Sequence, residues 1–273
     1  MSSWLLFLAA CAEPKEAAER TCAGHAELCE RRLDQVAFAA THNSMSNADD
    51  GWTFPNQGHG IPTQLQDGVR GFLLDTVEQD GELLLCHGYC SLGSVPLAEI
   101  LNKFKDFLDT NPDELLILIL QDGVSSEQTA TAFEQAGLVD RAWAWDGGAL
   151  PTLGALIEAD TRLIVSAEVE GPPPDWYHHA WDLFWDTPYE FSSTDEFNCD
   201  LNRGEQTNPL FLVNHWLGPL PSDALATEAN AEAVLGARAR TCADETGRLP
   251  TLVAVDHYEI GALFPVVDAL NGL

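Results

Sequence analysis

The chain has 273 residues, 45% of them hydrophobic, and carries a formal net charge of −30. That length is enough for one large core, and a single α/β barrel would use all of it. A chain this acidic lacks the positive surface that displaces counterions from a polyanion, which argues against nucleic-acid binding. The same charge disfavours strong docking on anionic lipid and favours a heavily solvated surface that attracts divalent cations.

The N-terminal segment, residues 1–21, resembles a lipoprotein signal and linker. A short apolar run precedes Cys11, and the sequence then becomes abruptly polar. The letters LAAC are similar to a bacterial lipobox, in which cleavage before the cysteine accompanies attachment of a lipid to its sulfur. We therefore expect an exported protein, either a cell-envelope lipoprotein held to the membrane through Cys11 or a secreted one. Residues 22–273 would form the folded domain.

The cysteines also fit export. If Cys11 carries lipid, the other six form an even set, as expected in an oxidising compartment. No pair has the spacing of a zinc knuckle, which disfavours a zinc site. Many connectivities are open, but two pairs are close enough in sequence for local disulfides and a third would close a long loop. The pairings we expect are Cys22–Cys29, Cys86–Cys90 and Cys199–Cys242.

Seven apolar runs alternate with helical patterns along the rest of the chain. Each run is too continuous for a half-exposed strand and is typical of a strand buried on both faces of a parallel sheet. In chain order the runs are Val36–Ala40, Gly71–Asp75, Leu83–Cys86, Leu115–Leu120, Leu163–Ala167, Leu210–Val213 and Leu252–Val255.

Helical spacing of apolar residues predicts helices over residues 97–112, 125–137 and 229–241, the second capped by Ser125 or Ser126. A weaker helix over residues 260–271 is interrupted by Pro265. Residues 170–204 break the rhythm with prolines and closely spaced aromatics, which indicates a long functional loop region. Repeated strand-then-helix order predicts a (β/α) barrel, with a doubly wound sheet as the alternative.

Polar residues follow the apolar runs at the points where the strands should end. In a barrel of this kind the active site lies at the carboxyl ends of the strands. Each position taken alone has a structural explanation: a histidine is more often a hydrogen-bonded structural residue, and an aspartate often caps the next helix. Independent structural explanations do not account for so many suitable residue types at the strand ends together. The residues are His42, Asn43, Asp75, His87, Gln121, Asp122, Glu168, Asn214, His215, Asp256 and His257.

An ordered set of motifs then becomes visible. VAFAATHNSMSN is followed by PNQGHGIPTQLQDGVRGFLLDTVEQDGELLLCHG and FLDTNPDELLILILQD, and later by NRG, LFLVNHW and RLPTLVAVDHYEIG. Together they resemble the X domain of phosphatidylinositol-specific phospholipases C, in the small single-domain form of bacteria, fungi and plants. The resemblance covers roughly residues 20–273. It implies a single irregular TIM (β/α)8 barrel and a phosphodiesterase.

Carried over to this chain, the resemblance implies two catalytic histidines. His42 would be the general base that activates the inositol hydroxyl, and His87 the general acid that protonates the departing diacylglycerol oxygen. The first product would be an inositol cyclic phosphate. Asp256 would orient His42, although a helix cap is an equal alternative. Arg70 would reach phosphate, with a structural salt bridge as its alternative.

The resemblance also indicates a cation. Metal-independent relatives carry Asp and Arg at the positions of Asn43 and Asp75, whereas calcium-dependent ones carry Asn and Asp. This chain therefore resembles the calcium-dependent group, and its oxygen ligands are of the hard type that Ca²⁺ prefers. Gln121 and Asp122 occupy the position of a further acidic ligand. Since Leu73 replaces another, we expect a weak site.

The irregular region would line the headgroup pocket through Glu168, Trp181, Trp185 and Arg203. Three readings of the function stay open. The first is a phosphodiesterase on phosphatidylinositol-type lipids. The second is the same chemistry on another glycerophosphodiester, and the third is a non-catalytic cell-surface binding protein on the same barrel. In each case we expect a monomer that binds a phosphodiester lipid or its headgroup and no nucleic acid.

Overall fold

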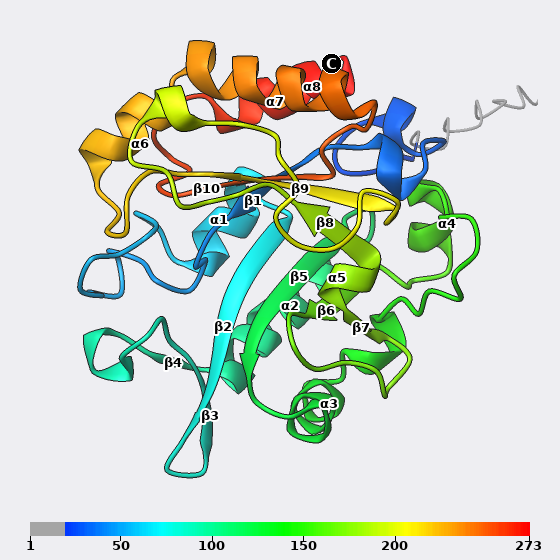
Figure 1. Cartoon of the computed structure of the whole chain (residues 1–273). Helices are drawn as coiled ribbons and strands as arrows, with labels where there is room; N and C mark the ends of the chain where they lie inside the picture. The colour runs from blue at the N-terminus through cyan, green and yellow to red at the C-terminus, as the bar shows by residue number, and fades with distance from the viewer. Residues whose placement is uncertain (1–19) are drawn as a thin grey trace, which may run out of the picture.

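A computed structural model describes residues 20–273, and its centre is a curled sheet with helices packed outside it (Figure 1). The predicted lipid-bearing Cys11 lies outside the described residues. Eight strands run parallel to their neighbours. They are β1 (Phe38–Thr41), β2 (Gly71–Gln79), β5 (Leu116–Gly123), β6 (Leu163–Ala167), β7 (Tyr177–His179), β8 (Phe184–Asp186), β9 (Leu210–His215) and β10 (Leu252–Val255).

The strand order shows that the barrel is irregular. Neighbouring strands follow the order β7–β6–β5–β2–β1–β10–β9–β8, so β7 and β8 are the two ends of the path. The short helix α5 (Ala180–Leu183) joins these two strands directly, but they pair with β6 and β9 and not with each other. The predicted irregular TIM-type barrel is therefore confirmed, as a curled parallel sheet with an open seam between β7 and β8.

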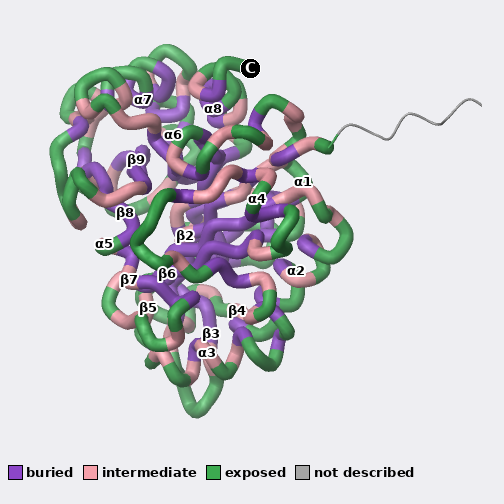
Figure 2. The backbone as a smooth tube through the Cα atoms, turned by 90° about the vertical axis from the view of Figure 1, so that its right-hand side faces the viewer, coloured by how far each residue is buried: buried purple, intermediate pink, exposed green. Residues whose placement is uncertain are grey.

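Burial on both faces explains the continuous apolar runs. In β5, Leu116, Leu118 and Leu120 belong to the core cluster that also contains the apolar face of helix α2 (Leu97–Thr110). Ile117 and Ile119 belong to a second cluster that includes residues of most other strands. Figure 2 shows the same arrangement, with buried backbone at the centre and exposed backbone around it. Alternate residues of one strand thus pack into two different layers of the hydrophobic core, one on each face of the sheet.

One predicted strand has a different role. The run Leu83–Cys86 was expected to be a parallel barrel strand, and this is wrong: β3 (Glu82–Leu85) folds back antiparallel on β2. The turn is Asp80-Gly81, and both residues have positive φ, at 54° and 84°. Asp-Gly is a favoured sequence for a two-residue hairpin turn. A two-residue strand, β4 (Val95–Pro96), then pairs with β3 outside the barrel.

Three predicted helices form as expected. Ser125 caps α3 (Ser126–Gln135) through a reciprocal capping box with Gln128. Pro265 does not interrupt the last helix, because that helix begins at Leu263 and places the proline in its first turn, where it is tolerated. Besides α2, α3 and α5, the α-helices are α1 (Ile61–Asp67), α4 (Leu153–Glu158), α6 (Asp223–Ala229), α7 (Glu232–Thr246) and the last helix, α8 (Leu263–Asn271).

Short 3-10 helices and disulfides complete the described fold. The three expected disulfides, Cys22–Cys29, Cys86–Cys90 and Cys199–Cys242, are all present. Within residues 20–273, no helix has the length and apolar character needed to cross a bilayer. The 3-10 helices are Ala26–Leu28, Leu33–Gln35, Cys90–Leu92, Val139–Arg141 and Thr194–Glu196.

Candidate active site

A cavity of about 170 Å³ opens where the parallel strands end. It is formed by residues at the carboxyl ends of β1, β2, β5, β6 and β9, with side chains from the loops that follow β3 and β8. This is the place that the strand-end rule indicated. The lining residues are His42, Asn43, Leu73, Leu74, Asp75, His87, Ile119, Gln121, Glu168, Tyr189, Arg203, Asn214 and Trp216.

The first histidine is held by a carboxylate from the neighbouring strand. Thr41 and Val255 are partners in the parallel register of β1 and β10, so the next residues, His42 and Asp256, come side by side. His42 Nδ1 donates to Asp256 Oδ1 at 2.9 Å, and Asn56 Nδ2 donates to the same oxygen at 2.9 Å. With Nδ1 engaged, Nε2 is the nitrogen left for proton transfer.

An aromatic ring fixes the same histidine from its face. Trp216 directly follows β9, and its ring stacks on the His42 imidazole with centroids 3.8 Å apart and planes within 3° of parallel. Tyr189 packs beside the tryptophan at 5.9 Å. Neither residue was expected at the site from the sequence. The only signal was the position of Trp216 at a strand end, within the motif LFLVNHW.

The second histidine comes from the hairpin. His87 follows β3, and because β3 returns antiparallel along β2, it lies beside Asp75 on the strand it left. His87 Nδ1 donates to Asp75 Oδ2 at 2.7 Å. This hydrogen bond raises the pKa of His87, against the opposing effect of partial burial. The imidazoles of His42 and His87 both line the pocket, with ring centroids 6.5 Å apart and planes at 73° in an edge-to-face arrangement.

A third wall of the pocket is polar and charged. Arg203 donates to Glu168 Oε1 at 2.9 Å and to the fully buried Asp186, and its guanidinium lies 4.0 Å from the centre of the Trp181 ring. Burial opposes the charge of Arg203, but Asp186 and Glu168 outweigh it and raise the pKa of the guanidinium. Burial raises the pKa of Glu168. The predicted Glu168 and Arg203 therefore meet in one ion-paired cluster. Trp181, predicted to line the pocket with them, packs on the Arg203 guanidinium and does not itself line the cavity.

Three predicted site residues are elsewhere. Arg70 precedes β2 at the amino end of the strand, where it pairs with Glu114 at 2.8 Å, which is the structural salt bridge given above as its alternative. Trp185 is fully buried and stacks on Phe211. Asp122 accepts hydrogen bonds from the backbone N–H groups of residues 169 and 170, and so anchors the loop after β6. None of the three lines the cavity.

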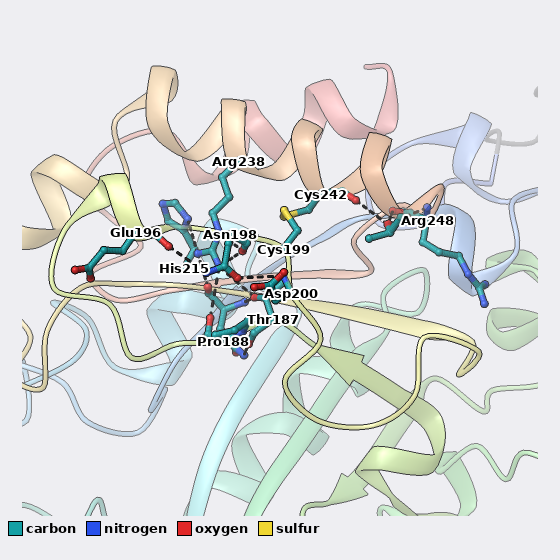
Figure 3. Close-up of a disulfide and its surroundings, with 12 residues drawn as sticks. Thr187, Pro188, Glu196, Asn198, Cys199, Asp200, His215, Arg238, Cys242 and Arg248 are labelled. Atoms are coloured by element: carbon teal, nitrogen blue, oxygen red, sulfur yellow. Dashed lines mark hydrogen bonds between the residues drawn. A yellow bond between two sulfur atoms is a disulfide. The ribbon is translucent and has the colours of Figure 1, made fainter.

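His215 also has a structural role, as is more often the case for a single histidine that follows a strand. It is fully buried, with Nε2 bonded to the Ala229 carbonyl at 2.8 Å and Nδ1 facing Arg238 at 3.3 Å. Burial and the neighbouring guanidinium lower its pKa to about 3. Figure 3 shows this group beneath helix α7, next to the Cys199–Cys242 disulfide. Arg238 there donates mainly to backbone carbonyls, which ties the loop after β8 to the barrel.

The donors for a cation are present but few. In the described part of the chain, no group of three or more His, Cys, Asp or Glu side chains is placed to hold a metal. The cavity does offer two carboxylates, Asp75 and Glu168, and the amides of Asn43 and Gln121. The amide nitrogen of Asn43 is buried and has no hydrogen-bond partner within residues 20–273. Since an amide can rotate to present oxygen or nitrogen, these residues suit a weakly held hard cation or a phosphate oxygen.

Comparison with solved structures supports the fold. The phosphatidylinositol-specific phospholipase C of Listeria monocytogenes aligns with a TM-score of 0.59 at 15% identity, over 89% of this chain and 94% of that one. A mutant of the Staphylococcus aureus enzyme aligns with a TM-score of 0.59 at 12% identity, over 88% and 94%. At such identities the likeness concerns the fold alone.

Sequence relatives are nearer. A PI-PLC X domain-containing protein 1 of Arthroderma benhamiae is 30% identical over 92% of this chain and 90% of its own length. An uncharacterized secreted protein of the same fungus and a PI-PLC X domain-containing protein of Arabidopsis thaliana are each 29% identical, over 96% and 88% of this chain. The chain spans 66% and 62% of the length of these last two. Residues 28–271 match the family PI-PLC X 1. The chain therefore belongs to the PI-PLC X family.

Proposed function

We propose that this chain is a phosphodiesterase that cleaves phosphatidylinositol-type lipids by acid–base catalysis. The observation that carries the proposal is the pairing of two neighbouring histidines with two separate carboxylates, His42 with Asp256 and His87 with Asp75. Each carboxylate fixes one tautomer of its imidazole and leaves Nε2 for the substrate. One phosphodiester can then meet a base on one side and an acid on the other.

The reaction follows from those positions. His42 Nε2 takes the proton of the headgroup hydroxyl adjacent to the phosphate, and the resulting alkoxide oxygen bonds to phosphorus. The bond from phosphorus to the diacylglycerol oxygen breaks, and His87 gives its proton to that oxygen. The products are a cyclic phosphate of the headgroup and a neutral diacylglycerol. Each proton transfer contributes roughly 10²- to 10⁴-fold to the rate.

The headgroup is assigned to the charged wall. Glu168 and the Arg203 guanidinium present an acceptor and a donor close together, which suits the vicinal hydroxyls of a polyol. Asn214 lines the same wall, and its buried side-chain oxygen has no partner among the described residues. A polar substrate bound here would satisfy that oxygen. We propose that these groups bind the headgroup and that Trp216 bounds it on the side of His42.

The leaving group is assigned to the opposite side of the histidines. A second cavity of about 100 Å³ shares His42 and His87 with the first. Its rim carries Phe54, Leu92 and Leu220, which are 57%, 40% and 55% exposed. Apolar side chains gathered at an exposed site indicate an interaction surface. A lipid leaving group would lie there, so that the cleaved bond joins a polar half and an apolar half.

The cation is a further part of the proposal. Asn43, Asp75, Gln121 and Glu168 would hold Ca²⁺ beside the phosphate, where it would offset the negative charge that develops during the reaction. Asp75 uses only Oδ2 to accept from His87, so Oδ1 is left for a ligand. Asp122, the fourth predicted ligand, is committed to backbone N–H groups instead. Two carboxylates give weak binding.

Export is the setting that we propose. One relative of similar sequence is named a secreted protein, and the three disulfides suit an oxidising compartment. Attachment to a membrane through lipid on Cys11 stays a prediction, as does the monomeric state. Mass spectrometry of membrane extracts tests the anchor, because an unmodified Cys11 in that fraction contradicts it.

A substrate panel tests the function. Wild type would be given phosphatidylinositol, glycerophosphoinositol and glycerophosphocholine, and release of the alcohol would be followed. We expect turnover of the two inositol compounds, and loss of turnover in the His42→Ala and His87→Ala variants. Turnover of all three would support the broader glycerophosphodiesterase reading. No turnover, combined with calorimetric binding of inositol phosphates, would support the binding-protein reading and overturn the proposal.

A further inference from the structure

The loop that carries His87 is closed on itself by a disulfide. Cys86 and Cys90 are bonded, so that His87, Gly88 and Tyr89 form the rest of a five-residue ring. Cys86 is fully buried, and its backbone N–H donates to the Asp75 carbonyl at 3.1 Å. Cys90 begins the 3-10 helix Cys90–Leu92. One half of the disulfide is therefore fixed to β2, the strand that also supplies the carboxylate partner of His87.

Apart from the His87–Asp75 hydrogen bond, one backbone hydrogen bond, from the Leu92 N–H to the Tyr89 carbonyl at 2.9 Å, holds this loop among the described residues. Among the described residues, no backbone N–H of His87, Gly88 or Tyr89 donates to a backbone carbonyl. The His87 side chain is half exposed and Tyr89 is 77% exposed, and a Cβ at Gly88 would meet nothing within 4 Å. Gly88 has φ of +66°, in the left-handed region that glycine adopts freely. Such a segment would sample many conformations without a crosslink.

We propose that the Cys86–Cys90 disulfide is a positioning device for the proton donor, which holds the His87 imidazole against Asp75 and opposite His42. The inference rests on the proposed function, since it assigns a role to the loop only if His87 protonates a leaving group. Productive geometry matters here because a small displacement of a catalytic group has a large effect on rate. The hydrogen bond to Asp75 orients the ring only while the loop keeps it within reach.

The length of the loop argues against a mainly global role. A crosslink stabilises a fold by restricting the unfolded chain, and the effect is smaller for shorter loops. The Cys86–Cys90 pair has a sequence separation of 4, against 43 for Cys199–Cys242. The shorter disulfide therefore restricts the unfolded chain least and the conformation of three loop residues most. It also restrains Tyr89, whose carbonyl accepts a hydrogen bond from the N–H of the rim residue Leu92.

The test compares two leaving groups. The double variant Cys86→Ser/Cys90→Ser would be assayed on glycerophosphoinositol, whose alkoxide leaving group needs a proton, and on a nitrophenyl ester of inositol phosphate, whose leaving group departs without one. A general acid contributes roughly 10²- to 10⁴-fold. We expect kcat to fall at least about tenfold on the first substrate, with KM unchanged, and to change little on the second.

A matched control is available in the chain. Cys22→Ser/Cys29→Ser removes another local disulfide, with a sequence separation of 7, and neither cysteine lines the catalytic cavity. This variant should keep the wild-type ratio of the two kcat values. Equal losses on both substrates in the Cys86→Ser/Cys90→Ser variant, or no loss, would overturn the inference while the proposed function stands. Wild type inactive on both substrates would remove the proposed function and this inference with it.

A second measurement covers the case in which the double variant does not fold. Wild-type protein would be treated with dithiothreitol, which gives two electrons and two protons to the disulfide and becomes a cyclic disulfide itself. Alkylation and mass spectrometry then identify the reduced pair. Selective loss of activity on the alkyl substrate when Cys86 and Cys90 are reduced is the expected result. An unchanged ratio of the two activities in protein reduced at this pair would contradict the proposal.

Discussion

The Asp75 carboxylate accepts a hydrogen bond from His87 Nδ1 at 2.7 Å, so the aspartate expected as a cation ligand is also the partner of the second histidine. On the other side of the pocket, Asp256 stands in the same relation to His42 at 2.9 Å. The two pairs come from different parts of the fold. Parallel register of β1 and β10 creates one, and the antiparallel return of β3 along β2 creates the other.

Substitution of Asp75 should shift the pH profile. His87 must be protonated to act as an acid, so the rate falls as the pH rises through its pKa. Asp75 raises that pKa, mainly through the hydrogen bond. In Asp75→Asn the pKa of His87 should therefore drop and the alkaline limb of kcat should move to lower pH. A profile of kcat against pH measures this, and an unmoved alkaline limb would refute the assignment of His87 as the acid.

The tryptophan on His42 should affect the chemical step. Stacked aromatic pairs contribute about 0.5–1.5 kcal/mol beyond the burial of their area. Trp216→Leu should therefore lower kcat about two- to tenfold by releasing the imidazole, and Trp216→Phe should keep most of the activity. Melting temperatures of both variants control for lost packing, since Trp216 is largely buried. Equal activity in wild type and Trp216→Leu would contradict this role.

Arg203 should act on binding. A hydrogen bond to a charged group contributes about 1.5–3 kcal/mol, and lysine reproduces neither the forked geometry nor the stacking on Trp181. Arg203→Lys should raise KM for glycerophosphoinositol by roughly tenfold or more, with a smaller effect on kcat. Arg70→Lys, at the other end of the barrel, is the control and should leave KM unchanged. The reverse pattern would show that the headgroup binds elsewhere.

The calcium prediction has a direct test. Activity should fall when a chelator is added and return with excess Ca²⁺. The affinity should be low, because Asp75 and Glu168 are the only carboxylates that the described residues contribute to the cavity lining. Calorimetric titration of Ca²⁺ into wild type and Asp75→Asn provides a readout independent of turnover. Activity that is unchanged by chelator, together with no heat of binding, would rule out the cation and leave the two histidine pairs to act alone.

His215 should make the fold sensitive to acid. Its pKa is lowered to about 3 in the folded chain, against a usual value of 6.5. The unfolded state therefore binds a proton first, and the stability that the neutral imidazole contributes is lost as the pH falls from 6.5 towards 3. Free energies of unfolding from urea titrations should fall less steeply over this range in His215→Gln. Parallel curves would contradict a buried neutral histidine.

Much of the site was predictable because strand ends are visible in the sequence. His42, Asp75 and Asp256 each follow or end an apolar run, and parallel strands bring such positions to one edge. The same rule argues against Arg70 as a site residue, since Arg70 precedes β2 and therefore lies at the opposite end of the barrel. His87 lies in the pocket as predicted, but it was expected to follow a parallel barrel strand and instead follows the antiparallel strand β3. The Asp80-Gly81 turn was the signal that a hairpin, not a barrel strand, delivers it.

The aromatic residues were less predictable. Trp181 and Trp185 were both expected in the pocket. Trp185, four residues later, lies in β8, where successive side chains point to opposite faces of the sheet. Asp186 therefore faces Arg203, whereas Trp185 packs against Phe211 in a separate cluster. Trp216 reaches His42 only because β9 neighbours β10 in the sheet. Such contacts depend on strand order, which the pattern of one sequence does not contain.

Phosphorus NMR on a reaction in progress directly tests whether the two histidine pairs cleave a phosphodiester through a cyclic product. Wild type would be incubated with glycerophosphoinositol and spectra collected until the substrate is consumed. We expect a cyclic phosphate resonance to appear first in wild type, and to be absent in both His42→Ala and His87→Ala. An acyclic phosphate formed without a cyclic precursor, or a cyclic product that persists in both variants, would contradict it.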